Sequence, residues 1–277
     1  MVYNMNEQQD RLSSVPPKST RTLVLELLRE ARGLWRSGEE ISSLIGLSRA
    51  AVSKHVRSLR EQGCVIEAAP RRGYRLTGEE EIFTRAAVCK SLNTRCLGKK
   101  WIWLEETDTT NNVAARAALE GMDEGCVVVA GHQSSGRGRK GHVWFSAPRS
   151  LAFTIVLRPS RLGGTELTAL AMQAVSAAIF RVTGLHVVIS QPNDILLEGR
   201  KICGVLAESG HRADELDWVV LGIGVNVNAG EQDFLPELRD RAASLFSISG
   251  NTVSRVALLR AILEELDILY LDAEGRA

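Results

Sequence analysis

The sequence predicts an α+β protein in two parts, a winged helix-turn-helix followed by a larger domain with a mixed sheet. Its 277 residues are enough for about two domains. Helical periodicity in the first part changes after residues 77–81 to alternating strand-like and helical runs. The charge is also uneven, because residues 18–76 carry twelve Lys or Arg and six Asp or Glu while the whole chain has a net charge of +1. We expect a flexible tail over 1–18, the winged helix over 19–80 and the larger domain over 81–277.

Composition excludes several classes of protein. Hydrophobic residues make up 44% and charged residues 24%, which is ordinary globular usage and argues against disorder, collagen and coiled coil. No apolar run approaches the ~18–20 residues of a membrane span, and the polar N-terminus has no signal-peptide core. The five cysteines are odd in number and form no C-x-x-C motif. A disulfide framework and a zinc cage are therefore disfavoured, and we expect a cytoplasmic protein.

Three helices are predicted in the first part. Thr20 starts the first helix, Glu39–Ile45 forms the second, and Ser48 caps a third that runs to about Gln62. A tight turn over residues 46–48 separates the last two. The residues expected to face inward are Leu23, Leu27, Leu28 and Ala31 on the first helix, Ile41, Leu44 and Ile45 on the second, and Ala51, Val52, either His55 or Val56, and Leu59 on the third.

Two helices joined by a glycine-containing turn are typical of the helix-turn-helix, whose second helix enters the DNA major groove. Residues 65–67 and 71–76 then predict a two-stranded wing with an arginine-bearing tip. The net charge of +6 over residues 18–76 suits a polyanion. The alternative is a basic, solvated helix in a protein-interaction module. The residues expected to contact DNA are Ser48, Arg49, Ser53, Lys54 and Arg57 on the third helix, and Arg71 and Arg72 on the wing.

Strand-like and helical runs alternate in the larger part, which predicts a mixed sheet. The expected strands are 101–104, 126–130, 152–157, 186–189, 202–207 and 218–225, and the expected helices are 113–119, 166–182 and 256–270. Glu198-Gly199 between two apolar runs predicts a hairpin turn.

Residues 136–144 combine three glycines with three cations and end on Trp144. Such a segment cannot form a core, because guanidinium groups are costly to bury unpaired. Glycines let backbone N–H groups approach a phosphate, and arginines bind phosphate bidentately. The segment therefore indicates a loop that orders around an anionic ligand, with Trp144 covering an apolar group or a base. The alternatives are a flexible surface loop or a contact with RNA.

Three other segments also carry polar groups that suit a ligand. Asp108–Asn111 follows a predicted strand, where Thr109 or Thr110 can cap a helix or face a polar ligand. The next segment is Gln191–Asp194 with Arg200–Gly204 on the far side of the predicted hairpin, in which Pro-Asn-Asp is typical of a turn. Within it, Lys201 stands at the start of an apolar strand and either points into a pocket or lies on the surface. Gly222–Asn228 allows close backbone approach and offers Asn226 to a base or ribose, although a closely packed strand explains it equally well. This pattern does not match the Rossmann fingerprint.

These four segments, in this order behind a winged helix, resemble the bifunctional biotin protein ligases that double as biotin operon repressors. The similarity covers about residues 20–270. The glycine-arginine loop with its Trp-Phe-Ser is the most specific element, and residues 48–55 are similar to the recognition helix of that family.

The resemblance implies a class II synthetase-like domain with a mixed sheet over 81–277 and a DNA-binding domain over 19–80. It implies a two-step reaction in which biotin and MgATP form biotinyl-5′-AMP, and a lysine of a biotin carboxyl carrier domain then accepts the biotin. It also implies operator DNA as a partner, bound by an adenylate-loaded homodimer, and no membrane partner.

On the biotin side, the resemblance assigns Thr109, Thr110 and Asn111 to a turn that contacts biotin, and Gln133 to a further biotin contact. Lys201 is similar to the family's lysine that meets the biotin carboxyl group and the adenylate.

Around the nucleotide, Arg137, Gly138 and Arg139 resemble the loop that the ligand orders, while Trp144 and Asn226 are similar to residues on the adenosine side. The resemblance implies that Arg137 and Arg139, together with Lys201, carry the catalysis.

The chain departs from the family pattern at three places. Ser190-Gln191 replaces the usual Lys-Trp before Pro-Asn-Asp, and Ala147–Ser150 replaces a Pro-x-Gly element. The sequence ends at Ala277, where similar proteins usually continue into a small β-barrel, so we expect this barrel to be absent. These departures leave two hypotheses, an active ligase and repressor, or a biotin-sensing transcriptional regulator with weak or no ligase activity. A lipoate-type ligase is disfavoured by the glycine-arginine loop.

Overall fold

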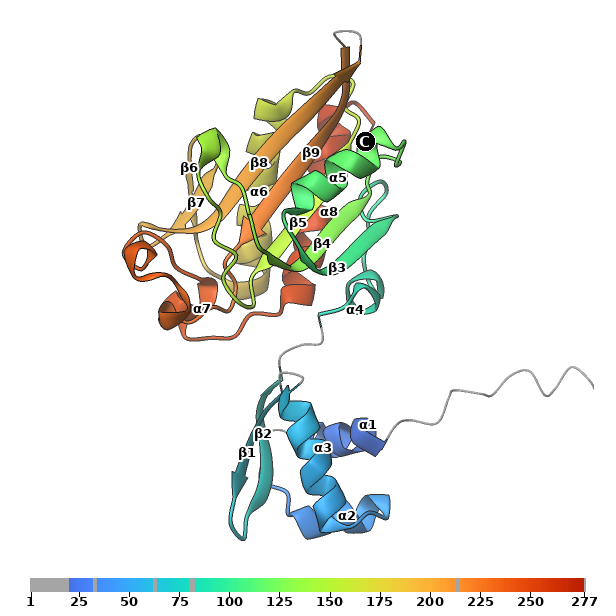
Figure 1. The fold of residues 1–277 in the computed structure, drawn as a ribbon, viewed down its shortest axis with the longest axis vertical. Helices are drawn as coiled ribbons and strands as arrows, with labels where there is room; N and C mark the ends of the chain where they lie inside the picture. The colour runs from blue at the N-terminus through green and yellow to red at the C-terminus, as the bar shows by residue number, and fades with distance from the viewer. Residues whose placement is uncertain (1–19, 32–33, 62–63, 80–82, 213–214, 277) are drawn as a thin grey trace, which may run out of the picture. The chain divides into compact units, whose positions relative to one another are not determined.

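The computed structural model describes residues 20–276 except 32–33, 62–63, 80–82 and 213–214 (Figure 1). The chain divides into two compact units, one up to residue 82 and one from residue 83. Each unit is described by itself. The predicted flexible tail over 1–18 lies outside the described residues.

The first unit holds three helices and a hairpin: α1 (Thr20–Glu30), α2 (Gly38–Ile45), α3 (Arg49–Glu61), β1 (Cys64–Ala69) and β2 (Gly73–Glu79). The predicted helix-turn-helix is present, since α2 ends at Gly46 with a φ of +67°. The backbone N–H of Ala51 donates to Ser48 Oγ at 3.2 Å, which confirms Ser48 as the cap of α3. β1 and β2 pair in antiparallel fashion and form the predicted wing.

The inward residues of the first unit differ from the prediction on two helices. Val24, Leu25 and Leu28 are the buried residues of α1, whereas Leu27 is only partly buried. Leu44 was expected inside and is 59% exposed. The buried face of α2 contains Ile41 and Ser42. With about 100° of rotation per residue, Leu44 therefore lies roughly 110° from the centre of that face.

The second unit is built on a seven-stranded mixed sheet in the order β3-β4-β5-β9-β8-β7-β6. Its strands are β3 (Trp101–Thr107), β4 (Val127–Gln133), β5 (Leu151–Leu157), β6 (Val188–Ser190), β7 (Asp194–Leu197), β8 (Arg200–Arg212) and β9 (Glu215–Val225). β3 and β4 are parallel, and the other neighbours are antiparallel. The predicted hairpin turn is confirmed at Glu198-Gly199, where both residues have positive φ.

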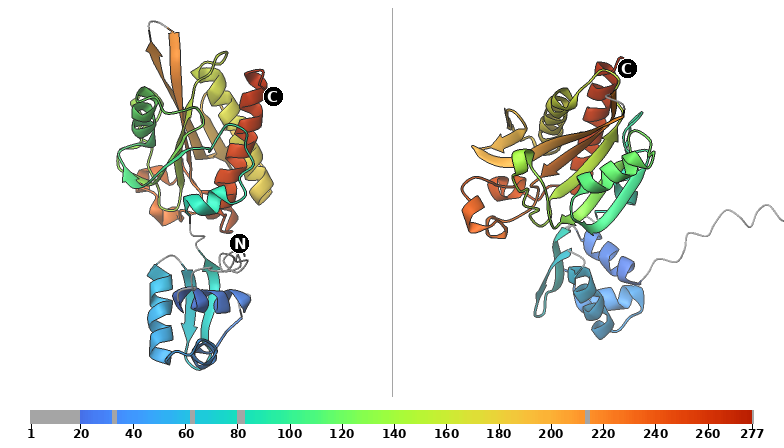
Figure 2. Two further views of the ribbon diagram at one scale, coloured as in Figure 1. Left: turned by 90° about the vertical axis from the view of Figure 1, so that its right-hand side faces the viewer. Right: turned by 45° about the horizontal axis from the view of Figure 1, so that its top comes forward.

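Helices cover both faces of this sheet (Figure 2). The helices described in this unit are α4 (Arg85–Cys89), α5 (Thr110–Leu119), α6 (Gly164–Thr183), α7 (Leu245–Ser249) and α8 (Arg255–Ala273). α5 packs on one face of the sheet, and α6, with α8 against it, packs on the other. β4 shows why two layers form, because Val127 and Val129 enter the main core with α6 and α8 while Cys126 and Val128 enter the core with α5.

None of the five cysteines forms a disulfide in the part of the chain that the structure describes. In the part of the chain that the structure describes, no helix combines the length and apolarity required to cross a membrane.

Glu274 joins the end of α8 to the loop before α6. Its buried carboxylate accepts hydrogen bonds from the Ser160 hydroxyl and from the backbone N–H groups of Ser160, Arg161 and Leu162 at 2.7–3.2 Å. Burial alone would raise the pKa of this carboxyl group, but the hydrogen bonds to its charged form outweigh burial and hold the pKa below the ordinary 4.5.

We predict that Glu274→Gln lowers the free energy of unfolding by about 1–3 kcal/mol at neutral pH, since buried backbone donors lose an ionised acceptor. Because the folded-state pKa is depressed, this stabilisation is complete above pH 4.5 and is lost as the pH falls through the folded-state pKa. Urea unfolding of the wild-type protein and of Glu274→Gln should therefore give a difference in the free energy of unfolding that becomes smaller at acidic pH. Exposed Glu237→Gln is the control, and an equal gap at every pH would contradict the prediction.

Candidate functional site

A pocket lies on the face of the sheet where α5 begins, over the central strands β8 and β9. The empty space within it, counted together with open solvent at its mouth, is about 410 Å³. Its floor is formed by Gly204, Gly222 and Gly224, of which Gly204 and Gly224 are direct partners across the two strands. A Cβ atom at Gly222 would lie 2.2 Å from Asn111 Oδ1, and one at Gly224 would lie 2.5 Å from the Trp144 ring. These positions require glycine because side chains lie directly on the backbone there.

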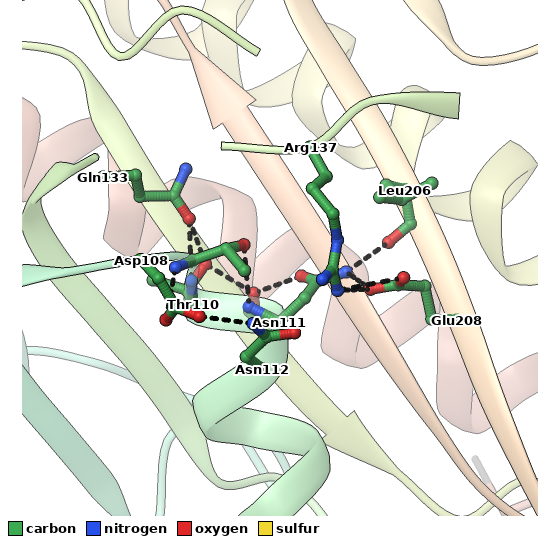
Figure 3. A network of polar contacts seen from close by, with 10 residues as sticks. Asp108, Thr110, Asn111, Asn112, Gln133, Arg137, Leu206 and Glu208 are labelled. Atoms are coloured by element: carbon green, nitrogen blue, oxygen red, sulfur yellow. Dashed lines mark hydrogen bonds and ion pairs between the residues drawn. The ribbon is translucent and has the colours of Figure 1, made fainter. Parts of the chain in front are cut away.

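One wall is a hydrogen-bond network at the N-terminus of α5 (Figure 3). Thr109 caps this helix, as predicted. Gln133 Oε1 accepts from the Thr110 backbone N–H at 2.7 Å and from the Thr110 hydroxyl at 3.0 Å. The amide nitrogen of Gln133 is therefore directed away from Thr110, as Figure 3 shows. The buried Thr154 hydroxyl on β5 lies 2.7 Å from both Thr110 Oγ1 and Asn111 Oδ1.

The turn before this helix is also tightly hydrogen-bonded. Asp108 accepts from the Asn112 amide and from the Thr109 backbone N–H. These hydrogen bonds lower the pKa of the Asp108 carboxyl group, with the Asn112 amide as the largest cause. The turn is thus held in shape by its own side chains.

Glu208 on β8 connects two walls of the pocket. Both of its carboxylate oxygens lie 3.1 Å from Arg137 Nη2, and its Oε2 accepts from Asn111 Nδ2 at 2.7 Å (Figure 3). Because an ionised carboxylate only accepts hydrogen bonds, Glu208 fixes the Asn111 amide with its nitrogen toward β8. The same carboxylate attaches the glycine-arginine loop to the sheet.

The loop over residues 136–144 folds back on itself. The Gly138 N–H donates to the His142 carbonyl at 2.7 Å, and the Trp144 N–H donates to the Gly136 carbonyl at 2.9 Å. This turn brings the Trp144 indole over the glycine floor. Ordering of the loop by a ligand stays a prediction.

Lys201 enters the pocket from the start of β8. Its Nζ lies 2.6 Å from Asp194 Oδ1 and 5.7 Å from the centroid of the Trp144 ring. A cation, a carboxylate and an indole therefore meet at this end of the pocket.

Eight of the ten predicted ligand contacts line this one pocket. They are Thr109, Thr110, Asn111, Gln133, Arg137, Gly138, Trp144 and Lys201. Arg139 lies instead in a neighbouring hollow with Gln191 and Pro192, which shares Asn193, Val205 and Leu206 with the pocket. Asn226 is outside the pocket lining and is 3% exposed, and its Oδ1 has no hydrogen-bond partner among the described residues.

Sequence reasoning missed Glu208 and Thr154. Thr154 is a polar residue within an otherwise apolar run, which was the one signal available for it, whereas Glu208 lies just beyond the apolar run 202–207 and gave no such signal. Their importance depends on strand register, since Thr154 pairs with Gly222 and so lies beside the pocket floor.

The described residues contain no group of three His, Cys, Asp or Glu side chains placed to hold a metal ion.

The predicted DNA contacts all lie on the surface of the first unit. Ser48, Arg49, Ser53, Lys54, Arg57, Arg71 and Arg72 are exposed. Arg49 at the start of α3 and Arg71 in the turn between β1 and β2 line one hollow, together with Glu39. The helix and the wing thus present cations to the same concave surface.

We predict that Glu208→Gln makes the loop over residues 136–144 more sensitive to trypsin, because Arg137 loses its ion-pair partner. Both side chains of the pair are about 40% exposed, 44% for Arg137 and 37% for Glu208. The pair is therefore worth about 0.2–1 kcal/mol, or roughly 1.4- to 5-fold in cleavage rate. Mass spectrometry of the fragments locates the cut. Exposed Glu106→Gln is the matched control, and an unchanged rate for Glu208→Gln would show that Glu208 does not hold the loop.

Comparisons with known proteins agree with this arrangement. A model of the biotin/lipoate A/B protein ligase family matches residues 103–226, and a helix-turn-helix domain model matches residues 20–75. The bifunctional ligase/repressor BirA of Bacillus subtilis (strain 168) is 36% identical over 252 residues, which cover 90% of this chain and 78% of that protein.

Similar proteins are found more widely. BirA of Escherichia coli (strain K12) is 29% identical over 71% of this chain and 61% of its own length. The structure of biotin protein ligase from Aquifex aeolicus in complex with biotin and ATP superposes with a TM-score of 0.57 and 29% identity, over 65% of this chain and 73% of that chain. The chain therefore belongs to the biotin protein ligase family, in the group of bifunctional ligase/repressors with an N-terminal helix-turn-helix domain.

Proposed function

We propose that this protein is a biotin protein ligase that also represses transcription as a biotin-dependent regulator. The observation that carries the proposal is the gathering of eight predicted ligand contacts around one pocket, seven from three of the four polar segments and the eighth being Gln133. The second unit binds biotin and MgATP, and the helix-turn-helix unit binds operator DNA.

The reaction has two steps. An oxygen of the biotin carboxylate attacks the α-phosphorus of MgATP, and pyrophosphate leaves to give biotinyl-5′-AMP. The amine of a lysine on a biotin carboxyl carrier domain then attacks the acyl carbonyl, and AMP leaves. Magnesium enters as part of the nucleotide substrate.

Positive charge supplied by the chain stabilises the first step, which crowds several anionic oxygens together. Lys201 lies at the end of the pocket beside Asp194, where its ammonium neutralises the biotin carboxylate and the adenylate. Arg137 uses Nη2 toward Glu208, so its other N–H groups remain for the phosphoryl oxygens. Arg139 lines the neighbouring hollow and serves the nucleotide from that side.

Trp144 and Asn226 serve the adenosine side. The indole lies over Gly224, and the unpartnered Oδ1 of Asn226 suits the amino group of a base. The loop over residues 136–144 closes over the adenylate and keeps water away from a mixed anhydride that hydrolyses readily.

Repression couples the filled pocket to DNA. The adenylate-bound protein forms a homodimer, whose two helix-turn-helix units match the two half-sites of a palindromic operator. Arg49, Ser53 and Lys54 on α3 read base edges, while Arg71 and Arg72 contact phosphates.

A second candidate function is a biotin sensor with weak or no ligase activity. The hollow that contains Arg139 also contains Gln191, which stands with Ser190 where the family usually has Lys-Trp. A cation and an aromatic ring are thus missing beside the nucleotide.

We predict that the wild-type protein transfers labelled biotin from ATP and biotin to a carrier domain, and that Lys201→Ala lowers adenylate formation about 10²–10³-fold, as for loss of one oxyanion-stabilising group. Release of pyrophosphate and labelling of the carrier are measured in parallel. Exposed Lys90→Ala is the control. Tight biotin binding without transfer would favour the sensor, and an unchanged rate in Lys201→Ala would remove Lys201 from the mechanism.

We predict that Arg49→Ala weakens operator binding by about 1–3 kcal/mol and relaxes base preference at one position, as expected for a side chain that reads a base edge. Selection of bound duplexes from a randomised pool, followed by affinity measurements, tests this. An equal loss of affinity on all duplexes would instead make Arg49 a phosphate contact.

A further inference from the structure

Two arginines of the wing, Arg72 and Arg75, differ in whether a carboxylate pairs with them. Arg75 on β2 pairs with Glu67 on β1, and the two residues are register partners with Arg75 Nη2 2.6 Å from Glu67 Oε2. The positive charge of Arg75 is thus neutralised within the hairpin. Arg72, in the turn, is exposed, and the described residues provide no ion-pair partner for it.

Trp35, from the segment before α2, lies against both arginines. The guanidinium carbon of Arg72 is 4.6 Å from the centroid of the Trp35 ring, and that of Arg75 is 4.9 Å from it. Both distances are within the range of a cation–π contact. The ring therefore gives Arg72 a fixed neighbour although no carboxylate binds it.

The backbone holds Trp35 in place independently of these arginines. The next residue, Arg36, exchanges two hydrogen bonds with Tyr74 on β2, each 2.8 Å long. Gly73 permits this close pairing, because a Cβ atom there would lie 2.2 Å from the Arg36 carbonyl oxygen. The backbone that carries Trp35 is thus attached to the wing through the hydrogen bonds of the next residue, Arg36.

A guanidinium that rests on an indole keeps its N–H groups free at its edge, and these groups match phosphate geometry. An exposed arginine normally loses rotamer freedom when it binds, and a side chain that is already ordered loses less. Arg71, the neighbour of Arg72, lines the same hollow as Arg49 of α3. The wing tip and the start of the recognition helix thus present cations to one surface.

We propose that Trp35 is a positioning residue for DNA, which holds the Arg72 guanidinium ready to bind a phosphate of the duplex backbone. Arg75 completes the stack and pairs with Glu67 rather than with DNA. The proposal rests on the DNA binding proposed above and adds the residue that prepares the phosphate contact.

The test measures binding of the full-length protein, with biotin and ATP present, to a random-sequence duplex over a range of KCl concentrations. Fluorescence anisotropy gives Kd and its dependence on salt. Arg72→Ala should reduce the salt slope by about 1, because one phosphate contact is lost. Trp35→Leu should weaken binding about 2- to 5-fold with the slope unchanged, since the charge stays but its ordering is lost.

Three further variants separate positioning from a general effect on folding. Trp35→Leu should cause no further loss in the Arg72→Ala background, and Trp35→Phe should restore most of the affinity. Arg72→Lys keeps the charge but loses the planar guanidinium that stacks on the indole. It should therefore weaken binding as much as Trp35→Leu does, although Trp35 itself is unchanged. Arg75→Ala is the matched control and should leave the salt slope unchanged.

Other outcomes overturn the proposal. A full effect of Trp35→Leu in the Arg72→Ala background, or wild-type affinity in Arg72→Lys, would show that Trp35 does not act through Arg72. A salt slope unchanged by Arg72→Ala, in a wild-type protein that binds DNA, would refute this inference alone. Failure of the wild-type protein to bind any duplex would refute the proposed DNA function as well.

Discussion

The pocket depends on side chains that lie directly against the backbone of the sheet, where three glycines leave room for them. Gly204 and Gly224 face each other across β8 and β9, and Gly222 lies beside them. Asn111 and the Trp144 indole occupy the space that side chains would take at Gly222 and Gly224. This contact sets the distance between the floor and both walls, and with it the positions of the hydrogen-bonding groups above the floor.

Each cation that lines the pocket has an acid beside it. Arg137 lies against Glu208, and Lys201 lies against Asp194. Partly buried charges are costly without partners, so these pairs keep the ligand-free pocket near neutrality. An anionic ligand must compete with both carboxylates, and the protein retains free donors on Arg137 for that purpose. Selectivity for a ligand with several anionic oxygens follows from this competition.

Local signals predicted most of the helices and strands and singled out polar segments that line the pocket. Ser48 as a cap and Glu198-Gly199 as a turn follow from short-range backbone chemistry, which one segment contains in full. Gathering the four polar segments required the family resemblance, because nothing local to them shows that they meet. Glu208 and Thr154 were missed since their hydrogen-bonding partners, on α5 and on the glycine-arginine loop, are far away in sequence. Leu44 was misplaced because periodicity gives the angle between residues but not which side of a short helix its neighbours cover.

The shared carboxylate of Glu208 has a consequence for how the pocket fills. It binds Asn111 at the start of α5 and Arg137 on the glycine-arginine loop, so neither partner can move without altering the electrostatic surroundings of the other. A change of position at either wall therefore reaches the other wall through a single charged group. Under the proposed function, with biotin beside α5 and the nucleotide under the loop, each ligand would change the affinity of the other by the same factor.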